Sequence, residues 1–242
     1  MAEDYDFPWL DEHDRFTFPA VETASPEGIV GVGGNLSPGM VLSGYRQGIF
    51  PWYAPGEPIL WWSPDPRAVI LPDTLHVPKS MRRILRRREF TLTIDRAFER
   101  VIVECATAER DHDGTWITDE MNDAYVRLHR LGYAHSVEVW HGSELAGGLY
   151  GIGLGAAFFG ESMFSRVSNA SKAAFIPFAR AMFRAGVRFI DSQVYTDHMA
   201  RLGAVEIPRS RFVALLHEAL SVPDPKGAWT ARESLLEEAA KP

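Results

Sequence analysis

Two acidic residues at core-like positions, Glu161 and Asp191, carry the strongest signs of chemistry in this chain. Glu161 lies in the apolar run AAFFGESMF, and Asp191 lies in VRFIDSQV, two residues before Gln193. A buried acid is costly unless it is paired or neutralised. On a strand, Asp191 and Gln193 point to the same side. The carboxylate is therefore expected to orient the amide, or to act with it on one substrate group.

A purely structural explanation accounts for Asp191 equally well. The acid would then form an ion pair with an arginine such as Arg166 or Arg188, and the pair would serve stability alone. Composition and periodicity do not separate these two readings.

Other familiar chemistries are disfavoured. Gly151-x-Gly153-x-x-Ala156 resembles a dinucleotide fingerprint, but strand-like residues follow it where a helix is required. The sequence has no Walker loop, no G-x-S-x-G elbow and no H-E-x-x-H. Asp111-His112-Asp113 is interpreted as a solvated loop, because adjacent residues rarely converge on one ion. Cys105 is interpreted as an inert core thiol. No metal and no organic cofactor is expected.

Length and composition limit the class of protein. At 242 residues the chain is one large domain, or one domain with a smaller companion. The acidic start MAEDYDFPWLDEHD is unlike a signal peptide, and no apolar run is long enough to cross a membrane. A single cysteine excludes an internal disulfide and fits a reducing cytoplasm. The net charge of −7 argues weakly against nucleic-acid binding as a general property.

The segment KSMRRILRRR, residues 79–88, is a local exception to that acidity. Met81, Ile84 and Leu85 repeat with helical spacing and predict one buried stripe. Six of the 25 basic residues stand in these ten positions, among them Lys79, Arg82, Arg83, Arg86 and Arg87. Such a patch on an acidic protein suits the docking of a polyanion. A solvated charged face is the plainer alternative.

Aromatic residues gather in FPWYAPGEPILWWSPDPRAVILP, residues 50–72, where proline interrupts regular structure. Trp61 and Trp62 are interpreted as core filling. Phe50 and Trp52, on a proline-stiffened turn, are candidates for the wall of an apolar pocket. Trp116, in GTWIT, either faces a cleft or packs on the helix that follows.

The pattern of the remaining chain alternates between strands and helices. Residues 1–27 are expected to form an extended arm. Period two places Phe159, Glu161 and Met163 on one face of a strand. The expected elements are a helix from Ser37-Pro38 to Gln47; a strand over 90–95 and a helix capped by Asp95; a helix capped by Thr118; half-buried strand 135–140 and strands 145–155 and 157–164; a helix capped by Ser168 or Asn169; strand 187–194; a short helix capped by Thr196; a last strand over 205–213; and a helical tail.

Taken together, these motifs resemble the leucyl/phenylalanyl-tRNA–protein transferase family. The resemblance runs through GVGGNLSP, GIFPWYAPGEPILWWSPDPRAVI, GTWIT, LGYAHSVEVW, FFGESMFSRVSNASK, FIDSQV and LGAVEIPR, and covers most of residues 29–213. It implies an α+β fold in which a GNAT-like mixed sheet with flanking helices (residues 67–242) follows a small N-terminal domain (residues 1–66).

The resemblance also implies an activity and its site. The family moves leucine or phenylalanine, or methionine, from charged tRNA to proteins that begin with arginine or lysine, which marks them for N-end rule degradation. By position, Asp191, Gln193 and Glu161 match the catalytic residues. Phe50, Trp52 and Trp116 match the pocket for aminoacyl-adenosine, with Phe159 and Met163 as further substrate contacts, and the basic helix matches the tRNA surface. A cytoplasmic monomer that needs no membrane is expected.

Two other functions explain part of the pattern. An acyl-CoA N-acetyltransferase needs a glycine-bearing loop before a helix, but SRVSNAS, residues 165–171, contains no glycine. A non-enzymatic RNA-binding module accounts for the basic helix and leaves Glu161 and Asp191 without a role.

Overall fold

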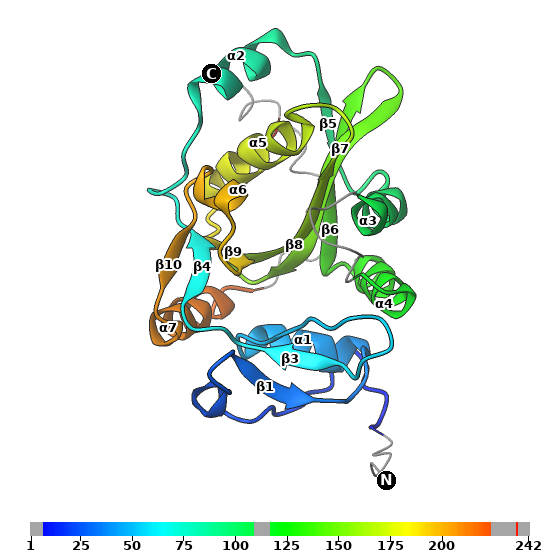
Figure 1. Ribbon diagram of the computed structural model, residues 1–242, viewed down its shortest axis with the longest axis vertical. Helices are drawn as coiled ribbons and strands as arrows, with labels where there is room; N and C mark the ends of the chain where they lie inside the picture. Colours follow the sequence, from blue (N-terminus) through cyan, green and yellow to red (C-terminus); the bar gives the residue numbers. More distant parts are fainter. Residues whose placement is uncertain (1–6, 109–116, 224–235, 237–242) are drawn as a thin grey trace.

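The computed structural model describes residues 7–108, 117–223 and 236. Its centre is a seven-stranded mixed sheet in which every neighbouring pair is antiparallel except β8 and β9 (Figure 1). In spatial order the strands are β10 (Val205–Ile207), β4 (Arg67–Ile70), β9 (Phe189–Gln193), β8 (Ala157–Ser165), β7 (Glu144–Leu154), β6 (Ala134–His141) and β5 (Thr91–Ile94). The parallel pair is joined by a helix, because parallel neighbours need a crossover connection.

A smaller unit built from the N-terminal part of the chain lies at one end of this sheet (Figure 1). It contains a three-stranded sheet and one helix, α1 (Pro38–Arg46). Its strands are β1 (Ile29–Val32), β3 (Leu60–Trp62) and β2 (Phe50–Pro51), and a short 3-10 helix covers Val21–Thr23. Residues 7–27, expected to be an extended arm, pack on this unit, since Phe18 is buried and its ring lies 4.7 Å from that of Trp61.

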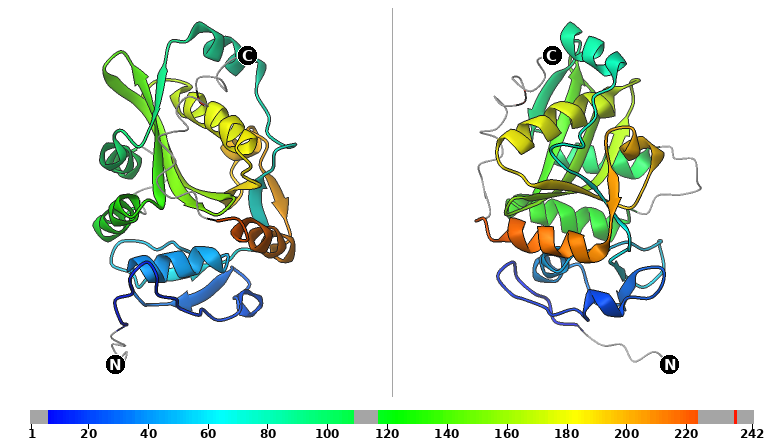
Figure 2. Two further views of the ribbon diagram at one scale, coloured as in Figure 1. Left: turned by 180° about the vertical axis from the view of Figure 1, so that it is seen from behind. Right: turned by 90° about the vertical axis from the view of Figure 1, so that its left-hand side faces the viewer.

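Helices cover both faces of the large sheet, as the views in Figure 2 show. On one face lies α5 (Ala170–Arg184), with α2 (Lys79–Arg87) packed against it. On the other face lie α3 (Phe98–Thr107) and α4 (Asp119–Arg130), and α7 (Arg209–Leu220) lies near β8. The buried apolar residues form two clusters accordingly, and the N-terminal unit shares the cluster of α3, α4 and α7.

Several sequence predictions are confirmed by these elements. Helices begin at Pro38 and Lys79 as expected, and Met81 and Leu85 form the buried stripe of α2. Thr118 caps α4, since its Oγ1 accepts a hydrogen bond of 3.1 Å from the backbone N–H of Met121. Thr196 caps α6 (Asp197–Ala200) in the same way.

Other details were wrong. Asp95 does not cap α3, which begins after Ala97; its carboxylate instead accepts from the backbone N–H of Ser136 and contacts His135. Strand β6 is buried over most of its length rather than half-buried, because helices cover both of its faces. Asn169 stands at the N-cap position of α5, as one of the two predicted residues, but its side chain makes no capping bond.

The predicted strand over 205–213 is another error. Strand β10 ends at Ile207, and residues 209–220 are the helix α7. Phe212, Leu216 and Ala219 are its buried residues, and their i, i+4, i+7 spacing is helical. The predicted helical tail falls outside the described residues apart from Leu236.

A bulge in β8 at Glu161 changes which of the following side chains face the α4 side of the sheet. Gly151 of β7 pairs with Gly160, whereas Tyr150 pairs with Ser162, so Glu161 is the extra residue. A bulge reverses which side chains face which side of a strand. Phe159 belongs to the cluster on the α4 face, but Met163 packs against the α5 cluster. The prediction that Met163 shares a face with Phe159 and Glu161 is therefore wrong.

We predict that this bulge depends on the absence of a side chain at Gly151. A Cβ there would overlap the carbonyl oxygen of Phe159 and the ring of Phe158. Gly151→Ala should lower the free energy of unfolding by about 3 kcal/mol or more, as overpacking against backbone does. Gly31→Ala is the control, because its Cβ would make an ordinary contact with Trp61 at 4.0 Å. Equal values for the two variants in denaturant unfolding would contradict the prediction.

Candidate active site

The site begins with an ion pair buried in the core between strands β4 and β9. The guanidinium of Arg67 binds both carboxylate oxygens of Asp191: Nε lies 2.9 Å from Oδ1, and Nη2 lies 2.7 Å from Oδ2. Both side chains have 0% exposure. The guanidinium lies over the rings of Phe50 and Phe212, at 4.7 and 4.4 Å from their centroids, and Nη1 donates to the Gly48 carbonyl at 3.2 Å. Fork geometry and flat aromatic contacts of this kind suit arginine rather than lysine.

The sequence had left open whether Asp191 pairs with an arginine. It does, but Arg166 binds Glu104 and Arg188 binds Glu218 at the surface. The sequence prediction missed Arg67, because residues 50–72 were interpreted only as a proline- and aromatic-rich segment. The available signal was an arginine at the start of the apolar run RAVIL, where an unpaired charge has no place.

Gln193 lies between two buried carboxyl groups at the end of β9. Its backbone adopts φ 64°, and its N–H donates to Asp191 Oδ1 at 2.9 Å. Its side-chain Nε2 donates to Glu161 Oε1, also at 2.9 Å. Asp191 therefore fixes the backbone of Gln193, and Glu161 fixes its amide. The three residues predicted from the sequence do come together. The side-chain amide of Gln193 is oriented by Glu161, however, and not by Asp191 as expected.

Glu161 receives two further hydrogen bonds, from phenols on two different helices. Tyr45 of α1 donates to Oε1 at 2.7 Å, and Tyr125 of α4 donates to Oε2 at 2.9 Å. Burial raises the pKa of Glu161 to about 7; the bonds from the two phenols and Gln193 oppose the rise, and the charge of Asp191 adds to it. Burial also raises the pKa values of both tyrosines well above the usual range, so both phenols carry their protons at neutral pH.

The predicted pocket residues lie in different surroundings. Phe50 is buried against Arg67, and Phe159 is buried beside Tyr45, with ring centroids 5.0 Å apart. Trp52 is 40% exposed and packs on Trp62, whose Nε1 donates to the Trp52 carbonyl. Trp116 lies outside the described residues.

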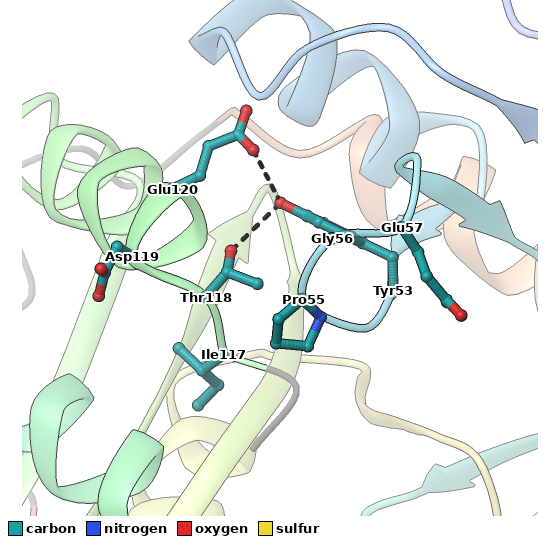
Figure 3. Close-up of a pocket in the computed structure, with 8 residues that line it drawn as sticks. All are labelled: Tyr53, Pro55, Gly56, Glu57, Ile117, Thr118, Asp119 and Glu120. Atoms are coloured by element: carbon teal, nitrogen blue, oxygen red, sulfur yellow. Dashed lines mark hydrogen bonds between the residues drawn. The ribbon is translucent and has the colours of Figure 1, made fainter. Parts of the chain in front are cut away.

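A cavity of about 620 Å³ lies between the turn after Trp52 and the start of α4 (Figure 3). Tyr53 points across it, and its hydroxyl lies 3.3 Å from Thr118 Oγ1 and 3.1 Å from Glu120 Oε2. The lining mixes apolar and acidic side chains: Tyr53, Pro55, Gly56, Glu57, Ile117, Thr118, Asp119 and Glu120. The same helix, α4, carries Tyr125 to Glu161, so one element connects the cavity with the buried acids.

The basic helix α2 lies away from this cavity, against α5 at the far end of the sheet (Figure 1). Its side chains Lys79, Arg82, Arg83, Arg86 and Arg87 are exposed. Burial, together with the neighbouring charges of Arg184 and Arg82, lowers the pKa of Arg180 on α5. The positive surface therefore extends from α2 onto α5.

Two further features are absent from residues 7–108, 117–223 and 236. These ranges hold no group of three or more histidine, cysteine, aspartate or glutamate side chains placed to bind a metal ion. Nor do they hold a helix with the length and apolar character that crossing a bilayer requires.

Comparison with known proteins places this geometry in context. The family model for leucyl/phenylalanyl-tRNA protein transferase matches residues 69–217, and the model for the N-terminal domain of that transferase matches residues 34–65. The chain is 54% identical over 229 residues to the leucyl/phenylalanyl-tRNA–protein transferase of Chromohalobacter salexigens, covering 94% of this chain and 89% of the relative. It is also 56% identical over 214 residues to the protein of the same name from Syntrophus aciditrophicus, covering 88% of this chain and 90% of the relative.

We predict that Arg67 is required because it neutralises Asp191. Arg67→Met leaves a buried carboxylate without a partner, which should lower the free energy of unfolding by about 3–5 kcal/mol. Arg188→Met is the matched control: it removes the exposed pair with Glu218, which should cost at most about 1 kcal/mol. Denaturant unfolding near neutral pH measures the free energy of unfolding of both variants. Similar decreases for the two would show that the buried pair stabilises the fold no more than an exposed pair does.

Proposed function

This chain belongs to the leucyl/phenylalanyl-tRNA protein transferase family of aminoacyltransferases, and we propose that it transfers leucine, phenylalanine or methionine to proteins that begin with arginine or lysine. The amino acid arrives as an ester on charged tRNA, and the product would enter N-end rule degradation. The observation that carries the mechanism is the placement of Gln193, whose backbone N–H donates to the buried Asp191 and whose side-chain amide donates to the buried Glu161.

The reaction makes an amide from an ester and an amine. The α-amino nitrogen attacks the ester carbonyl, the bond to the ribose oxygen breaks, one proton leaves the nitrogen, and the ribose oxygen gains one. An α-amino group has a pKa near ~8, so only a minority is neutral at neutral pH. Holding amine and ester at attack distance can supply roughly 7–11 kcal/mol of the barrier.

Gln193 is the residue we place at the attacking amine. Its Nε2 is held by Glu161, so its amide oxygen serves as the acceptor for an amine N–H. Asp191 holds the backbone of Gln193 in the left-handed conformation through Oδ1. Because Arg67 binds both oxygens of Asp191, we give this carboxylate a positioning role rather than the role of a base. Glu161, with a pKa of about 7, gives or takes a proton near neutral pH.

The cavity beside α4 is our candidate for the substrate groups. Tyr53, Pro55 and Ile117 offer apolar surface, with Trp52 and Trp116 next to them in the chain. Glu57, Asp119 and Glu120 offer negative charge, which supports a cationic acceptor. The apolar part of this cavity would separate leucine, phenylalanine and methionine only weakly, since a methylene is worth about 1–3 kcal/mol. Phe50 and Phe159 support this region from the core.

The wider organisation is proposed on similar grounds. A GNAT-like fold is supported by the β8–α5–β9 crossover, which places one parallel pair in an otherwise antiparallel sheet. We place the boundary between residues 66 and 67, where β4 begins. We propose a monomer in the cytoplasm, where charged tRNA, the donor, is made.

Removing the amide of Gln193 should separate catalysis from binding. We expect Gln193→Ala to lower the rate of labelled leucine transfer from Leu-tRNA to a peptide with N-terminal arginine by roughly 10²–10⁴-fold. The affinity for the tRNA should not change, because the basic helix lies elsewhere. A matched peptide that begins with glutamate is the acceptor control. Transfer of acetyl groups from acetyl-CoA in place of leucine would contradict the proposed reaction.

The basic helix should hold tRNA through phosphates. Arg82→Ala combined with Arg83→Ala should weaken binding and reduce the slope of log affinity against log salt by about 1 per lost contact. Arg188→Ala combined with Arg211→Ala, which removes the same charge beside α7, should leave the slope unchanged. Equal slopes for the two double variants would rule out α2 as the tRNA surface.

A further inference from the structure

Two phenols and one carboxyl group, from three different elements, form a closed triangle in the core. The phenol oxygens of Tyr45 and Tyr125 are 2.7 Å apart. Tyr45 lies 2.7 Å from Glu161 Oε1, and Tyr125 lies 2.9 Å from Oε2. Tyr45 comes from α1 in the N-terminal unit, Tyr125 from α4 and Glu161 from β8. All three side chains are buried.

The number of protons decides which ionisation state fits this triangle. Each phenol has one proton to donate, and an ionised carboxylate has none. With Glu161 ionised, two protons serve three short contacts, so one pair of oxygens faces each other without a proton. With Glu161 protonated, three protons serve three contacts in one direction around the ring. In that state Glu161 Oε2–H donates to Tyr125, which is the reverse of the direction that this bond takes with an ionised carboxylate. Tyr125 then donates to Tyr45, and Tyr45 donates to Glu161 Oε1.

The surroundings of Glu161 favour the same state. The titratable and charged groups that face it are the phenols of Tyr45 and Tyr125, with Tyr150 of β7 beyond them, and Asp191 of β9. Arg67 is the nearby cation of β4, and it is bonded to Asp191. Among the described residues, no lysine, arginine or histidine forms an ion pair with Glu161. A second negative charge there would be uncompensated.

We propose that Tyr45 and Tyr125 are positioning residues that hold Glu161 as a neutral acid in a three-proton ring, and that this ring fastens the N-terminal unit to the sheet beside Gln193. The carbonyl oxygen of the neutral acid, Oε1, then also accepts from Gln193 Nε2. The ring and its proton rest on the geometry alone. Their importance for transfer rests on the proposed function.

Glu161→Gln tests the proton directly, because glutamine has the hydrogen-bonding pattern of the neutral acid. Its carbonyl can accept from Tyr45 and Gln193, and its amide can donate to Tyr125. In the wild type, the folded chain keeps the proton on Glu161 up to about pH 7, whereas the unfolded chain releases it near about pH 4.5. Unfolding therefore releases a proton between these values, and wild-type stability falls as the pH rises through that window.

The measurement compares the unfolding equilibria of the two proteins from about pH 5.5 to about pH 8. Titrations common to both cancel in the ratio of their unfolding constants. We expect the unfolding constant of wild type, divided by that of Glu161→Gln, to rise roughly tenfold per pH unit and to level off near about pH 7. A ratio that stays constant or falls as the pH rises would mean that Glu161 is an ordinary carboxylate, and it would overturn the proposal.

The two phenols are tested by Tyr45→Phe and Tyr125→Phe. Tyr53→Phe is the control, because Tyr53 also bonds to α4 but lies outside the ring. The carbon-13 carboxyl resonance of Glu161, identified by its absence in Glu161→Gln, should titrate near neutrality in wild type and in Tyr53→Phe. Its pKa should fall by about one unit or more in both ring variants, because the neutral acid loses the ring that holds its proton. An unmoved or raised pKa would mean that the phenols only pack or only donate to an ionised carboxylate, and would overturn their positioning role.

Transfer assays then connect the ring to the reaction. The ring variants should lower kcat and leave the affinity for Leu-tRNA unchanged. Unchanged kcat would remove the link to catalysis. If wild type transfers no leucine at all, the proposed function fails, while the pH dependence of unfolding still decides whether the ring exists.

Discussion

The burial of Arg67 and Asp191 is the constraint on which the rest of the structure depends. Two charges with no exposure are tolerated only if every strong donor and acceptor finds a partner. That condition determines the surroundings: two aromatic rings for the flat guanidinium, the Gly48 carbonyl for Nη1 and the Gln193 backbone for Oδ1. The N-terminal unit supplies Phe50, and α7 supplies Phe212, so a single ion pair defines how these parts meet the sheet.

Glu161 lies next to this pair but is bonded to neutral groups and not to a cation. Arg67 is committed to Asp191, so Glu161 has phenols and an amide for partners. Neutral donors leave the cost of burial largely in place, which is why the pKa of Glu161 rises to about 7. Two acids on adjoining strands thus have different characters: one is held as an ion by a cation, and the other is placed where its proton is retained.

Local patterns in the sequence predicted the acids and most of the helices, because amphipathic spacing and caps such as Thr118 act within a few residues. They did not predict the partners. Arg67 and Asp191 are 124 positions apart, and Tyr45 and Glu161 are 116 apart. Hydrophobic periodicity gives no information on contacts between residues so far apart in the sequence. A buried tyrosine also resembles an ordinary core residue. The bulge at Glu161 was also hidden, since it depends on the pairing of β7 with β8. The strand assigned over 205–213 failed because its apolar residues were counted by alternation and not by helical spacing.

The helical crossover between β8 and β9 has a consequence for how the protein reaches its native state. The strand that carries Asp191 pairs with β8 across the α5 crossover, and with β4 across a far longer loop. Contacts across such separations are slow to form, because loop entropy opposes them before they add stability. The two acids are ionised and hydrated in the unfolded chain at neutral pH. They lose that water when their partners pack against them, and two of those partners, Arg67 and Tyr45, come from the first third of the chain. The site is therefore complete only when these early segments have packed on β8 and β9.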